Sequence, residues 1–338
     1  MTAPLRLSRE AILAFRRRVQ ALDERLPAGP RSLQRAAWAG LQDSVPRSAL
    51  HSLHARVAGV RPDSWEDPAL VQVWGPRHAA YVVPADAHAA FTLARMPDSG
   101  RLPARARAIA DRAAKHLHGG RQTADVVARS VGIGNDIRYA SLTGTILIRW
   151  AGARQPVIWA VQTPRGTSAG ALQELVRRYL HVYGPSSMES FVRWGGLDAR
   201  RAAVAFSALG EELLAARTPL GDAWLLAADA ATIPSTAADT ETARLLPSGD
   251  PYYLLWNADR ALLVPDRKRR AVLWTTRVWP GALLLGGEIV GTWRRSKVSV
   301  TISPWRRLHQ DELRRVEDEA ATLPIPDTSG PIVVRWER

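Results

Sequence analysis

The sequence predicts an α+β protein in which three tandem groups, each of helices followed by a β-hairpin, precede a C-terminal region made mainly of strands. Three times along the chain, segments with apolar residues at helical spacing are followed by two segments with the apolar alternation of strands. Proline- and glycine-rich joints separate the groups. These joints predict four regions: 1–98, 99–166, 167–238 and 239–338.

The first group has the plainest pattern. Three segments carry helical periodicity: 7–26, 31–40 and 46–58. Ser8 is suited to cap the first helix, and Pro46 is suited to the first turn of the third. Two alternating segments follow, at 69–74 and 78–83, and Gly-Pro-Arg between them predicts a hairpin. Three helices followed by a two-stranded hairpin make a winged helix, a variant of the helix-turn-helix.

The same order recurs twice, which predicts three tandem winged-helix units. The second unit has a helix over 102–117, a helix that Thr123 can cap, and strands at 146–152 and 155–161. The third unit has helical patterns at 171–184, 185–197 and 198–216 and a hairpin at 218–227. In the last region we expect strands at 260–266, 271–276, 281–295 and 297–303, and an amphipathic helix over 311–323. Gly286 and Gly287 suit a tight primed turn within the third of these strands.

The charge of the chain predicts a polyanionic partner. The 338 residues carry a formal net charge of +14, and only three of the 46 basic residues are lysines. The excess lies in two blocks, +8 over 101–165 and +9 over 260–310, whereas 166–259 carries −4. A composition bias of the genome explains many arginines but not this clustering, so we expect a nucleic-acid-binding face.

Several classes of protein are excluded or disfavoured. The chain has no cysteine, which excludes disulfides and thiolate metal sites. It has no apolar run of the ~18 residues that a membrane span needs, and its first residues lack the apolar block of a signal peptide. We therefore expect a cytoplasmic protein with no membrane association. His51 and His54 have a spacing that could ligate a metal, but no third ligand is indicated, so no metal or cofactor is expected.

Segments along the whole chain carry a family resemblance: GLQDS before ALHSLHARV, LVQVWGPRHAAYVVPAD, YGPSSMESFVRWGGL, TPLGDAW, ARLLPSGDPYYLLWNADRALLVPD and LLLGGEIVGTWRR. On these segments the chain resembles the AlkZ-like DNA glycosylases, often labelled winged-helix DNA-binding domain proteins. The resemblance implies three winged helices curved around double-stranded DNA. It also implies excision of alkylated purines, including bulky adducts and crosslinks.

The resemblance implies an active site in the first winged helix, at a Gln-x-Gln or Gln-x-Asp motif. By position the first glutamine is Gln42, and Ser44 occupies the third place, where the family pattern has Gln or Asp; Asp43 lies between them. These three are the candidate catalytic residues. A glutamine amide can orient water, and a carboxylate would add base strength. The alternative interpretation is structural: Ser44 or Asp43 would cap the following helix, and Gln42 would be a solvated turn residue.

For contact with DNA we favour polar residues in turns and at helix starts. The candidates are Arg47, His51, Arg77, His78, Arg138, Arg149, Arg294 and Arg295. Each could equally be a solvated surface charge. Phosphate contacts by these residues would fix the position of the DNA without reading its sequence. The thirteen tryptophans lie mostly in strand patterns and are expected in the core.

Two functions remain open from the sequence. The first is a glycosylase for positively charged alkylated bases. It would be monofunctional, because no lysine near the motif could form a Schiff base with the abasic sugar. The second is a non-catalytic DNA-binding protein, either a damage sensor or a transcriptional regulator. Ser44 favours the second function, and the full-length resemblance favours the first. We expect a monomer in either case.

Overall fold

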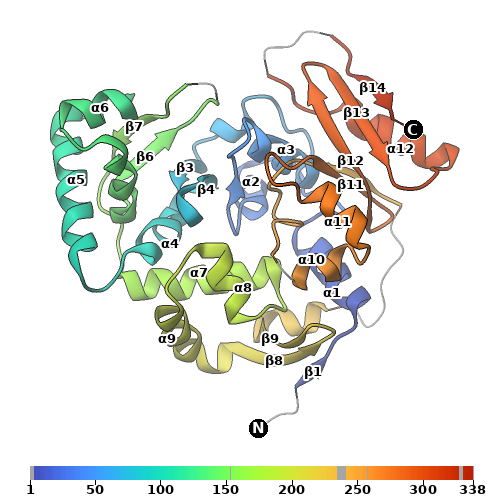
Figure 1. The fold of residues 1–338 in the computed structure, drawn as a ribbon, viewed down its shortest axis with the longest axis horizontal. Helices are drawn as coiled ribbons and strands as arrows, with labels where there is room; N and C mark the ends of the chain where they lie inside the picture. The colour runs from blue at the N-terminus through green and yellow to red at the C-terminus, as the bar shows by residue number, and fades with distance from the viewer. Residues whose placement is uncertain (1–3, 153, 234–240, 257, 327–329, 338) are drawn as a thin grey trace.

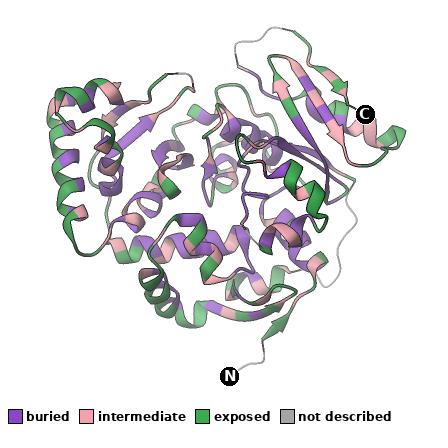
Figure 2. Cartoon of the chain, in the orientation of Figure 1, coloured by how far each residue is buried: buried purple, intermediate pink, exposed green. Residues whose placement is uncertain are grey.

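The computed structural model describes residues 4–152, 154–233, 241–256, 258–326 and 330–337. Helices and strands are mixed along the chain, so the expected α+β class is confirmed. In Figure 1 the segment around α5 (Arg101–Leu117) lies at the left, the segment around α7 (Ser168–Tyr183) below, and the C-terminal sheet at the right. The N-terminal helices lie between them. Figure 2 places the buried residues where these parts meet and the exposed residues on the outer faces of α5 and of α9 (Ala199–Leu209).

The first group contains three main helices: α1 (Arg9–Val19), α2 (Pro30–Ala36) and α3 (Ser48–Arg56). Ser8 caps α1 as predicted, since its side chain accepts a hydrogen bond from the Ala11 amide. The helix ends earlier than the expected residue 26, because Ala21 adopts φ 53° and the Leu22 amide bonds back to the Arg17 carbonyl. This is the Schellman closure.

The hairpins of the first and second groups form one sheet. In the first group β3 (Leu70–Trp74) pairs with β4 (Ala80–Pro84), which also pairs with β2 (Leu41–Gln42). The second group contributes β5 (Gln122–Thr123), β6 (Ile146–Arg149) and β7 (Val157–Ala160). The six strands run in the order β2-β4-β3-β6-β7-β5, and β3 meets β6 at Gln72 and Ile148. The helices α5 (Arg101–Leu117) and α6 (Ala124–Ser130) pack beside this sheet.

The third group follows the same order of helices and hairpin. Its elements are α7 (Ser168–Tyr183), α8 (Met188–Gly195), α9 (Ala199–Leu209), β8 (Leu213–Thr218) and β9 (Gly221–Leu226); the short α4 (His88–Thr92) packs against α7. An aromatic cluster fills its interior, in which Tyr179 stacks on Tyr183 at 4.8 Å and Trp194 lies beside both rings. The strand β1 (Leu5–Arg6) pairs in parallel with β8, so the third group holds a segment from near the start of the chain.

The C-terminal region is a five-stranded sheet covered by one helix. The strands are β10 (Ala243–Leu246), β11 (Gly281–Leu285), β12 (Glu288–Ser296), β13 (Ser299–Pro304) and β14 (Val333–Trp336), and the helix is α12 (Gln310–Ala321). Gly286 and Gly287 form the predicted tight turn, with φ values of 59° and 81°. The predicted boundary between 238 and 239 lies outside the described residues.

Two of the predicted strands are wrong. Residues 260–266 and 271–276 were expected as strands, but the chain there forms α10 (Ala258–Leu263) and α11 (Arg267–Leu273). The Asp266 side chain accepts hydrogen bonds from the amides of Lys268 and Arg269, which starts α11. A short apolar run fits a strand and a buried helix equally well. Here the capping aspartate favours the helix. Among the described residues, no helix combines the length and apolarity that crossing a bilayer requires.

Candidate functional site

Gln42 lies at the end of β2 and faces a pocket. It pairs with Tyr81 of β4 through the sheet, which fixes its backbone. Its half-buried side chain lines a pocket of about 390 Å³, and its Nε2 donates a hydrogen bond to the exposed Ser44 Oγ at 2.9 Å. Within the described part of the chain, the amide oxygen of Gln42 has no hydrogen-bond partner. That oxygen is therefore free to accept a hydrogen bond from water.

The pocket is built from two distant parts of the chain. The first group contributes Gln42, Ser44, Val45, Pro76, Arg77, Ala79 and Tyr81. The C-terminal region contributes Ser248, Gly249, Leu254, Trp256, Arg277, Val278 and Trp279. Its lining therefore carries two arginines and no carboxylate from the described residues.

Two half-buried indole rings give the pocket flat apolar surfaces. The guanidinium carbon of Arg77 lies 5.3 Å from the ring of Trp256, and that of Arg260 lies 5.2 Å from the ring of Trp279. Indole rings that line a pocket are surfaces on which a nucleobase can stack. Both tryptophans also pack against the main hydrophobic core, as expected, so they line the pocket and serve the core at once.

Asp43 does not line the pocket, contrary to its place among the candidate catalytic residues. Only 1% of its surface is exposed, and its carboxylate accepts hydrogen bonds from the Ala49 amide at 3.0 Å and from Gln72 Nε2 at 2.9 Å. Burial raises the pKa of Asp43 to about 7, and the Ala49 bond and the charge of Arg47 oppose that rise. Of the two residues considered for capping the following helix, Asp43 therefore has that role.

The start of α3 also differs from the prediction. The helix was expected to include Pro46 in its first turn, but it begins at Ser48, because Arg47 adopts a left-handed φ of 69°. The Ser48 hydroxyl donates to the carbonyls of Gln42 and Val45, which ties the helix start to the motif. The turn between Gln42 and α3 is therefore held by Asp43 and Ser48 together.

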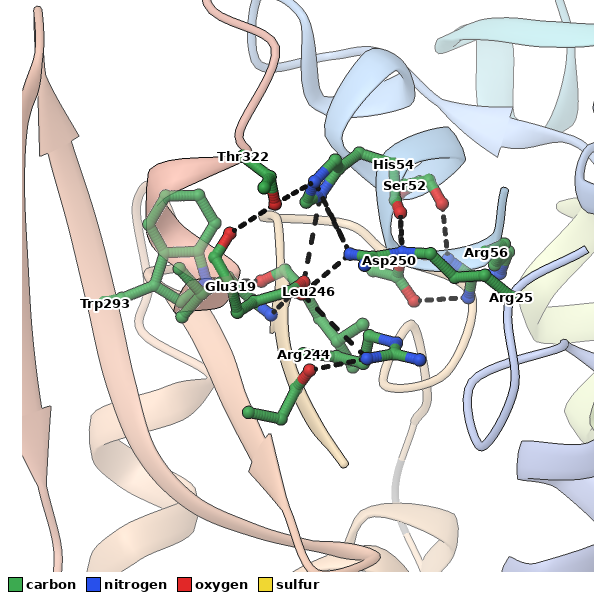
Figure 3. Close-up of polar contacts among 12 residues, drawn as sticks. Arg25, Ser52, His54, Arg56, Arg244, Leu246, Asp250, Trp293, Glu319 and Thr322 are labelled. Carbon is green, nitrogen blue, oxygen red and sulfur yellow. Dashed lines mark hydrogen bonds and ion pairs between the residues drawn. The ribbon is translucent and has the colours of Figure 1, made fainter. Parts of the chain in front are cut away.

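A buried ion pair holds the C-terminal wall of the pocket in place (Figure 3). Arg56 of α3 donates to both carboxylate oxygens of Asp250, at 2.7 and 2.8 Å, and the Ser52 hydroxyl donates to the same carboxylate at 2.7 Å. The Arg56 and Asp250 side chains are almost fully buried. Asp250 follows Gly249 directly, so this pair fixes the loop that contacts Gln42.

A second set of contacts joins α3 to α12 in the same interface (Figure 3). Glu319 accepts from Arg25 at 2.7 Å, and His54 lies 3.0 Å from the Thr322 hydroxyl. Burial, followed by the charge of Arg25, lowers the pKa of His54 to about 3, so its imidazole is neutral. No group of three His, Cys, Asp or Glu side chains within the described ranges could hold a metal.

Two of the candidate DNA contacts stack on one tryptophan. The guanidinium carbons of Arg47 and Arg149 lie 4.1 and 5.0 Å from the ring of Trp65. Arg149 also pairs with Glu66 at 2.7 Å, which offsets part of its charge. Arg47 donates to the Trp150 carbonyl at 3.4 Å. These contacts hold both arginines beside the hairpin of the second group.

The other candidates differ in exposure. Arg77, Arg138 and Arg294 are exposed, and Arg295 is half-buried and donates to the Lys297 carbonyl. His78 packs against the Tyr139 ring, and burial lowers its pKa to about 4, so it carries no charge at neutral pH. His51, also a candidate DNA contact, is only 4% exposed and lies beside Trp293, so it is buried and not a surface residue.

Comparison with known proteins identifies the family of this chain. A sequence model described as DNA glycosylase AlkZ-like matches residues 33–324. The chain belongs to the AlkZ-like DNA glycosylase family. The predicted resemblance is therefore confirmed, and with it membership of a DNA repair family that binds DNA.

A curated sequence and a solved structure, both from Streptomyces sahachiroi, are similar to this AlkZ-like chain. A curated protein named interstrand DNA cross-link repair glycosylase is 24% identical over 217 residues, which cover 55% of this chain and 57% of that protein. The match thus spans little more than half the length of that relative. The solved structure of the DNA glycosylase AlkZ superposes with a TM-score of 0.79 at 19% identity, covering 98% of this chain and 100% of that chain. The structural match supports the AlkZ-like fold.

Half of the pocket of this AlkZ-like protein was missed in the sequence. Ser248, Gly249, Trp256 and Trp279 lie about two hundred residues after Gln42, and no local pattern joins them to it. The Ser-Gly-Asp-Pro turn at 248–251 was the available signal, because a glycine between two polar residues often marks a close backbone approach.

Proposed function

We propose that this protein is a monofunctional DNA glycosylase that hydrolyses the N-glycosidic bond of alkylated purines in double-stranded DNA. Membership of the family and the position of Gln42 support this proposal. The single observation that carries it is Gln42, which lines a pocket of about 390 Å³ and whose amide oxygen has no protein partner among the described residues.

The proposed fold around the DNA is three tandem winged helices, with the regions 1–98, 99–166 and 167–238, followed by the region 239–338. Each of the first three regions carries helices followed by a hairpin, and this order supports the proposal. Exposed arginines of the first hairpin, the second region and β12 would contact phosphates. A cytoplasmic, monomeric protein remains our prediction.

The proposed chemistry assigns few tasks to the protein. Alkylation at N7 makes the purine cationic, so the base leaves with its bonding electrons as a neutral group, and the sugar becomes an oxocarbenium-like cation. The Gln42 oxygen would accept a hydrogen bond from the attacking water, and Ser44 would hold the amide in that orientation. The water then bonds to the sugar carbon and loses a proton to solvent, which leaves an abasic site.

The pocket favours labile substrates. It carries no carboxylate from the described residues, and Asp43 is turned into the sheet, so little negative charge is available to stabilise the sugar cation. One positioned polar group contributes about 10²–10³-fold. A rate gain of that size serves a bond already weakened by a positive charge on the base.

The absence of a lysine among the pocket residues supports a monofunctional enzyme. The lysines of the chain are Lys115, Lys268 and Lys297, and none of them lines the pocket. Without an amine there, a Schiff base with the abasic sugar has no donor in the described site. The product would be an intact abasic strand.

The alternative is a non-catalytic DNA-binding protein that senses damage or regulates transcription. Ser44 in the place of a family Gln or Asp favours it, because serine supplies neither a carboxylate nor an amide. The two functions give different results with damaged DNA, because only the enzyme leaves abasic sites.

An incision assay tests the proposal. Double-stranded DNA containing N7-alkylguanine is incubated with wild-type protein, Gln42→Ala or Gln34→Ala and then heated in alkali. We expect strand breaks with wild type and Gln34→Ala. Gln42→Ala should lower the excision rate by about 10²–10³-fold without changing the affinity for DNA. Gln34 lies on α2 away from the pocket and controls for the substitution itself. Binding without breaks at high protein excess would establish the non-catalytic alternative.

A further inference from the structure

A second pocket of about 240 Å³ lies beside the first. The two pockets share Val45, Ser248, Val278 and Trp279 in their walls. Its remaining lining comes from the start of α3, the turn before Ser248, the start of β11 and the middle of β12: Pro46, Ser48, His51, Pro247, Pro280, Gly281, Trp293, Arg294 and Arg295. Because they share these walls, the two pockets are close enough for neighbouring parts of one ligand to occupy both.

The charge of this second pocket is positive. Arg294 and Arg295 of β12 line it, and no aspartate or glutamate does so among the residues that the structure describes. Arg295 uses one nitrogen to donate to the Lys297 carbonyl, which holds the side chain in place. Arg294 is exposed, and its side chain makes no hydrogen bond or ion pair within the described chain. At least one guanidinium is thus free for a ligand.

His51 gives the pocket a buried polar group that lacks a partner. The residue is 4% exposed, and its Nε2 has no hydrogen-bond partner in the described structure. A buried polar atom without a partner is unfavourable, so such groups usually have a protein, water or ligand partner. Burial, followed by the charge of Arg295, lowers the pKa of His51 to about 3, so the neutral ring can donate one N–H without adding charge.

We propose that the second pocket binds one phosphodiester group of the DNA strand, next to the nucleotide whose base enters the first pocket. The placement of that base rests on the proposed glycosylase function. Guanidinium groups suit phosphate oxygens because they donate in a fixed fork, and the His51 N–H adds a third donor. The proline, valine and tryptophan walls reduce the water around these contacts, which strengthens them.

A phosphate-neutralisation scan tests this proposal. Double-stranded DNA with a stable abasic-site analogue is made with one methylphosphonate at each position around the analogue in turn, and affinities are measured by fluorescence anisotropy. We expect wild type to lose about 10-fold or more at one position. Arg295→Gln should lose affinity for the unmodified DNA and no longer respond to the methylphosphonate at that position.

Two further variants sharpen the test. His51→Phe keeps a ring beside Trp293 and removes the N–H, so it should weaken the response at the same position only. Arg314→Gln is the matched control, because Arg314 lies on α12 in an exposed pair with Asp311 and outside the pocket. It should respond as wild type does. An equal methylphosphonate penalty in wild type and Arg295→Gln at every position would overturn the proposal.

Inorganic phosphate separates a backbone site from a site for the free ion. If phosphate binds wild type but not Arg295→Gln, while no methylphosphonate position is special, the pocket takes a free anion and the proposal is wrong. The scan measures affinity and the incision assay measures bond cleavage. A position-specific response without strand breaks would support the phosphate site and refute the glycosylase function. Strand breaks without a position-specific response would support the glycosylase function and refute the phosphate site.

Discussion

Gly249 lies against the amide of Gln42: a β-carbon at residue 249 would be 3.4 Å from Cδ of Gln42 and 3.5 Å from its Oε1. Gly249 has φ +77°, a conformation that glycine adopts without strain. The next residue, Asp250, is fixed by the buried pair with Arg56. The C-terminal region therefore sets the position of the amide on which the proposed chemistry depends.

Gly249→Ala should reduce excision by about 10-fold, because alanine strains the left-handed backbone at residue 249 and would shift the loop that packs against the Gln42 amide; the methyl group itself would lie only in ordinary van der Waals contact with that amide. The measurement is the single-turnover rate on DNA containing N7-alkylguanine. Gly119→Ala is the control, since Gly119 has φ +78° with nothing within 4 Å of its β-carbon. Both variants should lose about 1 kcal/mol of folding stability from the left-handed backbone. Equal excision rates in the two variants would contradict the role of Gly249.

Ser44→Asp should increase the single-turnover rate by about 10-fold or more, because a carboxylate beside the Gln42 amide would stabilise the sugar cation. Ser44→Asn has a similar shape without the charge and should leave the rate near that of wild type. If the aspartate and asparagine variants have the same rate, electrostatic stabilisation at this position is not limiting.

Asp250→Asn should destabilise the protein by about 3–5 kcal/mol, because Arg56 would be left as a buried charge with a neutral partner. Urea denaturation gives the free energy of unfolding. Asp311→Asn removes the carboxylate of an exposed pair with Arg314 and should cost less than about 1 kcal/mol. A small effect of Asp250→Asn would mean that the pair does not hold the 248–250 loop.

Asp43 should make stability depend on pH. Its pKa rises from 3.8 to about 7 on folding, so between these values the unfolded chain releases a proton that the folded protein keeps. The contribution of Asp43 to stability is therefore full below the lower value and is lost as the pH rises toward 7. The free energy of unfolding should fall by up to about 1.4 kcal/mol per pH unit in this window.

Comparison of wild type with Asp43→Asn isolates this carboxyl group from the other titrating side chains. Urea denaturation at pH values of about 5 and about 8 brackets most of the titration. The variant should lose less stability than wild type between the two pH values, whatever its absolute stability. The same loss in both proteins would show that Asp43 ionises in the folded state near its ordinary pKa.

Local signals in the sequence located most elements of the fold. The cap at Ser8 and the turn at Gly286 and Gly287 depend on residue type and nearby backbone groups only, and both are as predicted. The segments 260–266 and 271–276 were wrong because a short apolar run lacks a period, and the decisive contact is the Asp266 cap.

The candidate site was predictable in part. The position of Gln42 in a pocket follows the family pattern, and the place of Asp43 depends on Gln72, which no local rule connects to it. Trp256 and Trp279 reach the pocket through contacts between distant loops. The Arg56–Asp250 pair is one of these contacts. The Tyr253 hydroxyl makes the others, with the Pro247 and Pro280 carbonyls. Such contacts arise from packing between regions.

The sheet shared by the first two groups has a mechanical consequence. β3 and β6 lie side by side, and Gln72 bonds to both Asp43 and the Trp150 amide, so one sheet joins the described parts of these two groups. We expect this joined sheet to move as one body, with the backbone of Gln42 paired into its edge strand β2. A damaged nucleotide must therefore travel to the amide, and distortion of the double helix, whose stiffness varies with sequence, would set how readily each lesion is reached.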